Sequence, residues 1–115
     1  MAHMTTYTFR PYNHEDYDDC VQIFQQNTPQ YFHPGELADY KDYLKNYALG
    51  NYWIYMAGST TIGCAGIRVS ENIGRLVYGM ITPAYHRHGH GKDLLNFRLR
   101  KLVELAHVTH IKLET

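Results

Sequence analysis

The sequence lacks three features that mark common classes of protein: an excess of one charge, a cysteine pattern and a long apolar run. Eleven lysine and arginine residues balance eleven aspartate and glutamate residues, so no positive field would gather nucleic acid. No segment approaches the roughly 18 apolar residues of a membrane-spanning helix, and the N-terminus has no apolar signal core. We therefore expect a cytoplasmic protein with neither nucleic acid nor a membrane as partner.

Cysteine is also scarce, and its spacing argues against the usual sulfur-based sites. The two cysteines, Cys20 and Cys64, form no CxxC pair, so neither a disulfide framework nor a structural zinc site is indicated. We expect two buried thiols that pack as small hydrophobic side chains in a reducing compartment.

The length and composition are those of one ordinary globular domain. The chain has 115 residues, of which 44% are hydrophobic and 19% are charged, which is enough to bury a modest core. Residues 1–3 look like a remnant of an expression vector, so we expect residues 4–115 to form the single domain.

Hydrophobic periodicity predicts a mixed sheet with helices. Alternation predicts strands over residues 5–10, 51–57, 60–69, 75–82 and 109–114, and helical spacing predicts helices from about residue 14, over 35–47 and from about residue 89. The order β-α-α-β-β-β-α-β predicts an α/β fold of the α+β style, with a mostly antiparallel sheet and a final right-handed β-α-β crossover. Gly63 and Gly66, inside the third strand, indicate a bulge or a close backbone approach.

The last predicted helix carries an apolar stripe. Its members are Leu94, Leu95, Leu99, Leu102, Val103 and Ala106. We expect Arg98, Lys101 and Glu104 on the opposite side, as in an amphipathic surface helix.

The stretch YHRHGHGKDLL, which joins the fourth strand to that helix, allows three interpretations. Gly89 and Gly91 stand at the helix start, where unpaired N–H groups and the helix dipole favour phosphate. The alternating His86, His88 and His90 could instead bind a metal, or they could be structural or solvent-facing histidines. The sequence has no GxxxxGK[ST], GxGxxG or HExxH motif, so these residues alone leave all three interpretations open.

Residues 80–95, MITPAYHRHGHGKDLL, resemble the acyl-CoA signature of the GCN5-related N-acetyltransferase (GNAT) superfamily. In that signature an apolar strand end, a proline and an aromatic residue precede [Q/R]-x-x-G-x-[G/A], which opens a helix. The matching residues are Ile81, Pro83, Tyr85, Gly89, Gly91, Leu94 and Leu95. His86 departs from the pattern, because the family has glutamine or arginine there. The predicted element order also agrees with this superfamily.

The resemblance implies direct transfer of an acetyl group from acetyl-CoA, as co-substrate, to a primary amine. Backbone N–H groups would bind the pyrophosphate, and strand backbone would pair with the pantetheine arm. The pyrophosphate residues would be His86, Arg87, His88, Gly89, His90, Gly91 and Lys92. The pantetheine residues would be Met80, Ile81 and Thr82, which requires the fourth and fifth strands to splay apart. An N–H group near Ile81 would polarise the thioester carbonyl.

The resemblance also implies a base and an acceptor site, without a metal. A base must take a proton from the amine, directly or through water, and Tyr78 and Glu114 are the candidates. The acceptor, a small-molecule or peptide amine, would contact Asn27, Tyr31 and Phe32.

The family continues beyond the last predicted strand with another helix and a final pair of strands, which often supply a tyrosine that protonates the leaving thiolate. The chain stops at Thr115, so we expect a longer chain, a second chain or a homo-oligomer to cover the sheet edge. A second hypothesis follows from this short C-terminus: a non-catalytic module of the same fold that binds acyl-CoA or a protein partner.

Overall fold

A five-stranded sheet in the order β1-β2-β3-β4-β5 forms the centre of the computed structural model, which describes residues 5–28, 30–105 and 107–113. The strands are β1 (Tyr7–Pro11), β2 (Tyr52–Ala57), β3 (Thr60–Ser70), β4 (Ile73–Ile81) and β5 (His110–Lys112). The helices are α1 (Tyr17–Gln26), α2 (Leu37–Asn46) and α3 (His90–Val103). Strands β1 to β4 are antiparallel, and β5 lies parallel to β4. The predicted element order and mixed sheet are confirmed.

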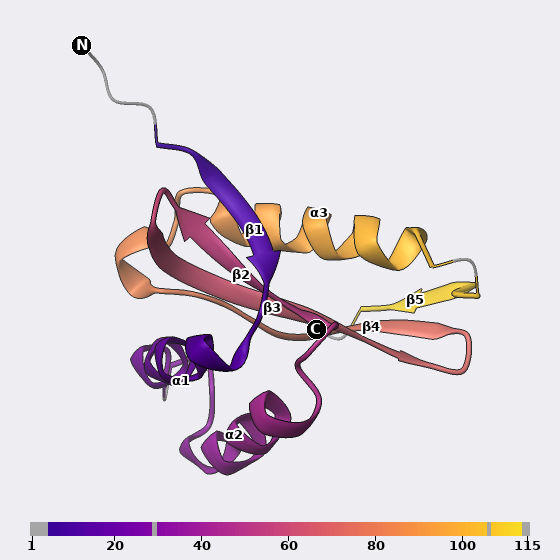
Figure 1. Ribbon diagram of the computed structural model, residues 1–115, viewed down its shortest axis with the longest axis horizontal. Coiled ribbons are helices and arrows are strands. Elements are labelled where there is room, and N and C mark those ends of the chain that lie inside the picture. The colour runs from indigo at the N-terminus through magenta and orange to yellow at the C-terminus, as the bar shows by residue number, and fades with distance from the viewer. Residues whose placement is uncertain (1–4, 29, 106, 114–115) are drawn as a thin grey trace.

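The sheet lies between two layers of helices. Figure 1 shows α1 and α2 on one face of the sheet and α3 on the other. β5 is shorter than the strand predicted over residues 109–114. Residue 114 of that prediction, and residues 1–3, lie outside the described residues. Within the described part of the chain, no helix combines the length and the apolar character needed to cross a membrane.

The turn into α1 is fixed by an ion pair and a capping box. Arg10 of β1 donates to both carboxylate oxygens of Asp16, at 2.8 and 2.6 Å. The backbone N–H of Asn13 also donates to Asp16, at 3.0 Å, while the Asn13 side chain accepts from the N–H of Glu15. Burial alone would raise the pKa of Asp16, but the hydrogen bonds from Arg10 and Asn13 hold that pKa below its ordinary value.

β4 contains one extra residue relative to β3. Cys64 pairs with Met80 and Gly66 with Val77, so three steps along β4 match two along β3. Tyr78, within this bulge, has a φ of 44°, which a bulky side chain rarely adopts. The irregularity predicted from the glycines of β3 is present, and its extra residue belongs to β4.

The second half of β4 has a free edge. β5 pairs with β4 only at Ile73–Arg75. Beyond Arg75, no strand among the described residues lies beside the far edge of β4. The backbone of this part of β4 is therefore open at its edge, as the predicted pantetheine site requires.

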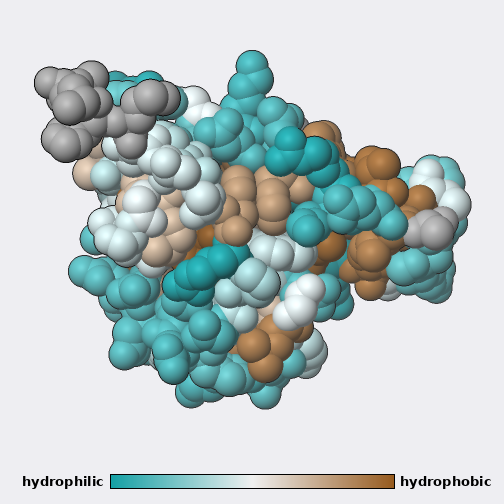
Figure 2. Space-filling model, turned by 45° about the horizontal axis from the view of Figure 1, so that its top comes forward, coloured by the Kyte–Doolittle hydropathy of each residue, from teal (hydrophilic) through white to brown (hydrophobic). Residues whose placement is uncertain are grey.

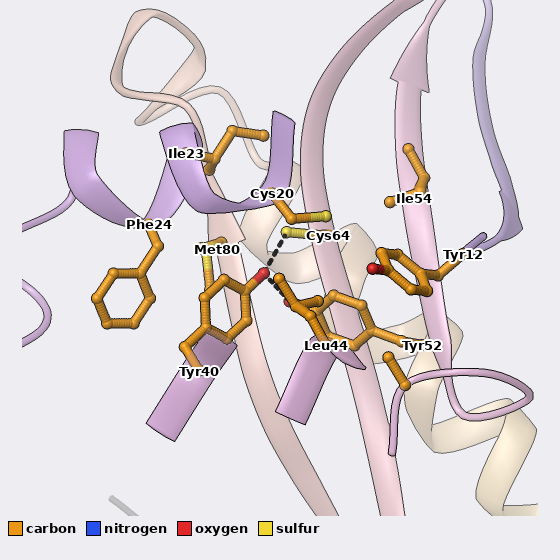
Figure 3. Close-up of a cluster of buried hydrophobic side chains, with 11 residues drawn as sticks. Tyr12, Cys20, Ile23, Phe24, Tyr40, Leu44, Tyr52, Ile54, Cys64 and Met80 are labelled. Carbon is orange, nitrogen blue, oxygen red and sulfur yellow. Dashed lines mark hydrogen bonds between the residues drawn. The ribbon is translucent and has the colours of Figure 1, made fainter. Parts of the chain in front are cut away.

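The core between the sheet and the pair α1–α2 contains hydrogen-bonded tyrosines, as Figure 3 shows. The Tyr40 hydroxyl lies 2.9 Å from the Tyr52 hydroxyl and 3.5 Å from Sγ of Cys64. Tyr52 donates to the carbonyl of Tyr78 at 2.7 Å, and so connects β2 to the bulge in β4. Cys20 and Cys64 are buried free thiols, which confirms the prediction for both.

The prediction for the two sides of α3 is wrong at two positions. Arg98, expected opposite the apolar stripe, is 9% exposed, whereas Val103, expected within the stripe, is 73% exposed. Arg98 lies four residues from both Leu94 and Leu102, and residues four apart share one face of a helix. Helical spacing therefore decides its side, although its charge suggests solvent.

Hydrophobic surface gathers at the end of the molecule where α3 ends and β5 lies, as Figure 2 shows. The exposed apolar side chains of this region are Val103, Ile111 and Leu113. Because β5 is the outermost strand of the described sheet, this surface lies beside an edge strand.

Candidate active site

A pocket of about 540 Å³ opens at the end of β4, between the segment after α1 and the start of α3. Its described lining residues are Asn27, Tyr31, Phe32, Gly79, Met80, Ile81, Tyr85, His86, Arg87, Gly91, Leu94 and Arg98. The pocket therefore brings all three predicted acceptor residues together with five of the predicted acetyl-CoA residues. Its volume is typical of a small-molecule site.

The backbone of Ile81 faces the free edge of β4. The N–H of Thr82 donates to the carbonyl of Ile62 on β3 at 2.8 Å, and hydrogen-bonded pairs alternate along an antiparallel ladder. Ile81 therefore turns its N–H and C=O away from β3, while Met80 turns toward Cys64. Among the three residues expected to pair with a pantetheine arm, only Ile81 presents its backbone to the edge.

The carbonyl of Ile81 is already occupied. The Asn27 amide donates to it at 3.1 Å, and Nε2 of His86 lies 2.7 Å away and donates, because a carbonyl can only accept. Asn27 is buried, and its second amide proton goes to the carbonyl of Ile23 at 2.8 Å. The N–H of Ile81 is therefore the backbone group left for a ligand at this point of β4.

The start of α3 has an open first turn, as the predicted phosphate cradle requires. Gly89 has a φ of 83°, and its carbonyl accepts the helical hydrogen bond from the N–H of Asp93. The residues between them, His90, Gly91 and Lys92, precede the first helical donor, so their N–H groups have no acceptor within the helix. A Cβ added at Gly91 would have no atom within 4 Å, so the backbone there is open to an incoming anion.

The three alternating histidines point to different places. Nε2 of His86 binds the β4 carbonyl described above, and His88 is exposed. His90 is buried, with Nδ1 3.0 Å from the Tyr55 hydroxyl and its ring 4.6 Å from that of Tyr7. Among the described residues, no group of three histidine, cysteine, aspartate or glutamate side chains could hold a metal ion.

The predicted acceptor residues form one wall of the pocket. Tyr31 is 60% exposed and places its ring edge-on to His86, with 5.4 Å between the ring centroids. Phe32 stacks on Phe24 of α1 at 4.5 Å and also lines the pocket. Phe32 therefore packs in the core beside α1 and also forms part of the pocket wall.

Thr82 and Tyr78 turn away from this pocket. The hydroxyl of Thr82 donates to Gln26 at 2.6 Å and lines a smaller cavity on the α1 side. The Tyr78 ring lies 4.9 Å from that of Tyr40 and 5.0 Å from that of Tyr43. Burial and the nearby acidic residues of α2 raise the pKa of Tyr78. Glu114, the other predicted base, lies outside the described residues.

Arg98 is the pocket residue that the sequence interpretation missed. It lies beside Gly79 of β4, where an added Cβ would stand 2.8 Å from both Nη1 and Nη2 of the guanidinium. The signal that could have revealed it is the four-residue spacing from Leu94, which places it on the sheet face of α3.

Comparisons with known proteins agree with this fold. The loading GNATL domain of CurA from Lyngbya majuscula is 14% identical, with a TM-score of 0.81 over 96% of this chain and 65% of that one. An N-acetylglutamate synthase from Neisseria gonorrhoeae, complexed with coenzyme A and L-arginine, is 15% identical, with a TM-score of 0.76 over 95% of this chain and 24% of that one. The aminoglycoside N-acetyltransferase AAC(6')-Iy, in complex with CoA, is 18% identical, with a TM-score of 0.68 over 100% and 80%.

These similarities cover different shares of the known proteins. The chain spans about a quarter of the synthase, 24%, and 37% of a putative acetyltransferase from Pyrococcus horikoshii. Coenzyme A in the synthase and aminoglycoside structures agrees with acetyl-CoA as the expected co-substrate of such a fold. No curated protein sequence matches the chain significantly. Residues 17–115, however, match the acetyltransferase (GNAT) family profile, and the chain therefore belongs to the GNAT family.

Proposed function

We propose that this protein transfers an acetyl group from acetyl-CoA to a primary amine, which attacks the thioester carbonyl directly. The observation that carries the proposal is the juxtaposition, in one pocket, of the free N–H of Ile81 with the open helix start at Gly91. The N–H of Ile81 can donate a hydrogen bond to an amide or thioester carbonyl, and the N–H groups at the helix start can bind a pyrophosphate. Acetyl-CoA, when bound, supplies the activated acetyl group.

The pyrophosphate site has two kinds of group. Unpaired N–H groups of the first turn of α3 donate hydrogen bonds, and the helix dipole adds partial positive charge. Arg87, which lines the pocket, and the exposed Lys92 add full positive charges at the same end. The His86 ring is bonded to the Ile81 carbonyl, so it positions the backbone.

The acceptor amine lies between Tyr31, Phe32 and the end of β4 in this proposal. Both amide protons of Asn27 are committed to carbonyls, so Asn27 can offer only its Oδ1 to the ammonium or amine. Tyr78 and Glu114 stay predictions for the group that takes the proton. The raised pKa of Tyr78 keeps its phenol neutral at neutral pH, so Tyr78 would act at high pH or through a water chain.

Calorimetric titration of acetyl-CoA tests the proposal. Wild-type protein should bind about one molecule per chain, and EDTA should not change the affinity because no metal takes part. Gly91→Glu should abolish binding, since a carboxylate would enter the space intended for phosphate. Gly91→Ala is the matched control and should bind within a few fold of wild type, because the family signature also allows alanine at this position and the methyl group meets no protein atom. Equal binding by the glutamate and alanine variants would refute the phosphate cradle.

One observation favours the second candidate, an acyl-CoA-binding module without catalysis. The described residues that line the pocket include no aspartate or glutamate, and Tyr78 does not line it. A panel of amines tested for CoA release separates the two candidates. Release with a suitable amine supports the enzyme, whereas tight binding of acetyl-CoA with no release across the panel supports the module.

A further inference from the structure

Arg98 has an unusual position for a charged side chain. Only 9% of the residue is exposed, although it carries a charge that arginine does not lose in proteins. Its side chain occupies the space that the missing side chain of Gly79 leaves against β4. The guanidinium is therefore held at the pocket wall by the strand beside it.

The guanidinium has donors to spare. Among residues 5–28, 30–105 and 107–113, its one hydrogen bond runs from Nε to the carbonyl of Leu94, at 3.2 Å. Nη1 and Nη2 have no acceptor there, and they form the flat fork that binds a carboxylate with two parallel hydrogen bonds. A largely buried charge without a counter-ion is costly, so an anion that reaches the Nη atoms from the pocket would be favoured.

The charge of the pocket supports an anionic ligand. Arg87 and Arg98 both line it, and no aspartate or glutamate is among its described lining residues. The two arginines lie at different ends, since Arg98 is seven residues beyond Gly91, about 10 Å along the axis of α3. Arg87 lies beside the proposed phosphate cradle and would pair with the pyrophosphate. The charge of Arg98, at the end of the pocket near Gly79, therefore needs a second anion.

We propose that Arg98 binds a carboxylate of the acceptor, and hence that the acceptor is a small amino-carboxylate such as an amino acid. This inference rests on the proposed acetyl transfer. Arg98 lines the same pocket as Tyr31 and Phe32, the residues that the proposed function assigns to the acceptor. The carboxylate on the guanidinium would hold the amine nitrogen near the thioester, and would leave no unpaired charge in the wall.

The test compares matched acids and amides. Amino acids with short and long spacers between amine and carboxylate are each paired with their carboxamide, and binding is measured calorimetrically to protein saturated with CoA. At least one acid should bind about tenfold or more tightly than its amide, because the amide lacks the charge that pairs with guanidinium. Arg98→Met should remove this preference, and Arg98→Lys should keep part of it.

Two controls keep the outcome specific. Arg100→Met changes an exposed arginine of the same helix and should leave the acid preference intact. Acetyl-CoA should bind Arg98→Met within about threefold of wild type, and thermal unfolding should show that the variant is folded. Equal binding of acids and amides by wild type, an unchanged preference in Arg98→Met, or a loss confined to acetyl-CoA affinity would each overturn the inference.

The same data separate this inference from the proposed function. If wild-type protein binds acetyl-CoA but does not distinguish acids from amides, the result supports the proposed function and refutes the role of Arg98. If acids bind through Arg98 but acetyl-CoA does not bind at all, the result supports a carboxylate site at Arg98 and refutes the proposed acetyl transfer.

Discussion

The side-chain amide of Asn27 donates a hydrogen bond to the carbonyl of Ile81 at 3.1 Å, and so fastens the C-terminal end of α1 to the end of β4. The two residues are 54 positions apart in the chain. The contact also positions the proposed acetyl-CoA site, because the N–H of the same residue, Ile81, faces that site.

Replacement of Asn27 by alanine should lower the free energy of unfolding by about 2 kcal/mol, since a buried carbonyl loses a partner. Urea unfolding measures this cost. Asn46→Ala is the matched control: Asn46 also donates to the carbonyl four residues before it, that of Asp42, but it is exposed and its side-chain hydrogen bonds all go to Asp42. A cost for Asn46→Ala as large as that for Asn27→Ala would show that the helix-end bond, and not the link to β4, supplies the stability.

Two glycines of neighbouring strands should respond very differently to alanine. An added Cβ at Gly63 would stand 2.7 Å from the backbone oxygen of Met80, which cannot move without distorting β4. At Gly79 the three nearest atoms would all belong to the end of the flexible Arg98 side chain. We expect a loss of about 2 kcal/mol or more for Gly63→Ala and less than about 1 kcal/mol for Gly79→Ala, by chemical denaturation. Gly79→Ala should still displace the guanidinium, and should therefore weaken acid binding in a nearly wild-type fold.

The two glycines of the cradle have separate roles. Gly89 has a φ of 83°, so Gly89→Ala should destabilise the protein by about 1 kcal/mol through backbone strain. Gly91 lies in the helix itself and meets no neighbour, so Gly91→Ala should be neutral or slightly stabilising. Thermal unfolding of the two variants side by side checks this order, and the reverse order would contradict the conformation of the turn.

The ion pair between Arg10 and Asp16 predicts a dependence of stability on pH. The folded-state pKa of Asp16 is lowered, so its contribution is complete above the unfolded value of about 3.9 and is lost as the pH falls through the folded value. Asp16→Asn should cost about 2 kcal/mol at pH 7. The difference from wild type should shrink below about pH 4. A difference that stayed constant down to pH 2 would mean that charge is not its source.

Tyr78→Phe tests the predicted base. The variant should keep its affinity for acetyl-CoA, because the ring packs against Tyr40 and Tyr43 on the other side of the sheet from α3. If the phenol takes the proton, kcat should fall about 100-fold. The wild-type rate should also rise with pH beyond 10, since the pKa of Tyr78 is raised. An unchanged kcat would remove Tyr78 from the reaction.

The order of the elements could be predicted because the period of the hydrophobic pattern changes from helical to alternating after residue 50. The open start of α3 could be predicted because glycine at a strand–helix junction permits the positive φ that Gly89 adopts. The position of Arg98 is only half predictable. Its spacing from Leu94 indicates the sheet face of α3, but its charge suggests solvent, and the room for its guanidinium depends on the contact with Gly79 of β4. The direction of the His90 side chain likewise depends on Tyr7 and Tyr55, which are far away in the sequence.

The extra residue in β4 sets which side chains share a face. Tyr78 and Met80 both join the core beneath α1 and α2, while Gly79 and Ile81 face α3. Val77 and Tyr78, although consecutive, line one cavity together. Deletion of the extra residue, Tyr78, would make the pairing of β3 with β4 regular and leave Gly79 and Ile81 toward α3, whereas a deletion in a regular part of the strand would move the following side chains to the opposite layer. The bulge is therefore the one point of this pairing at which β4 could lose a residue without exchanging its two faces.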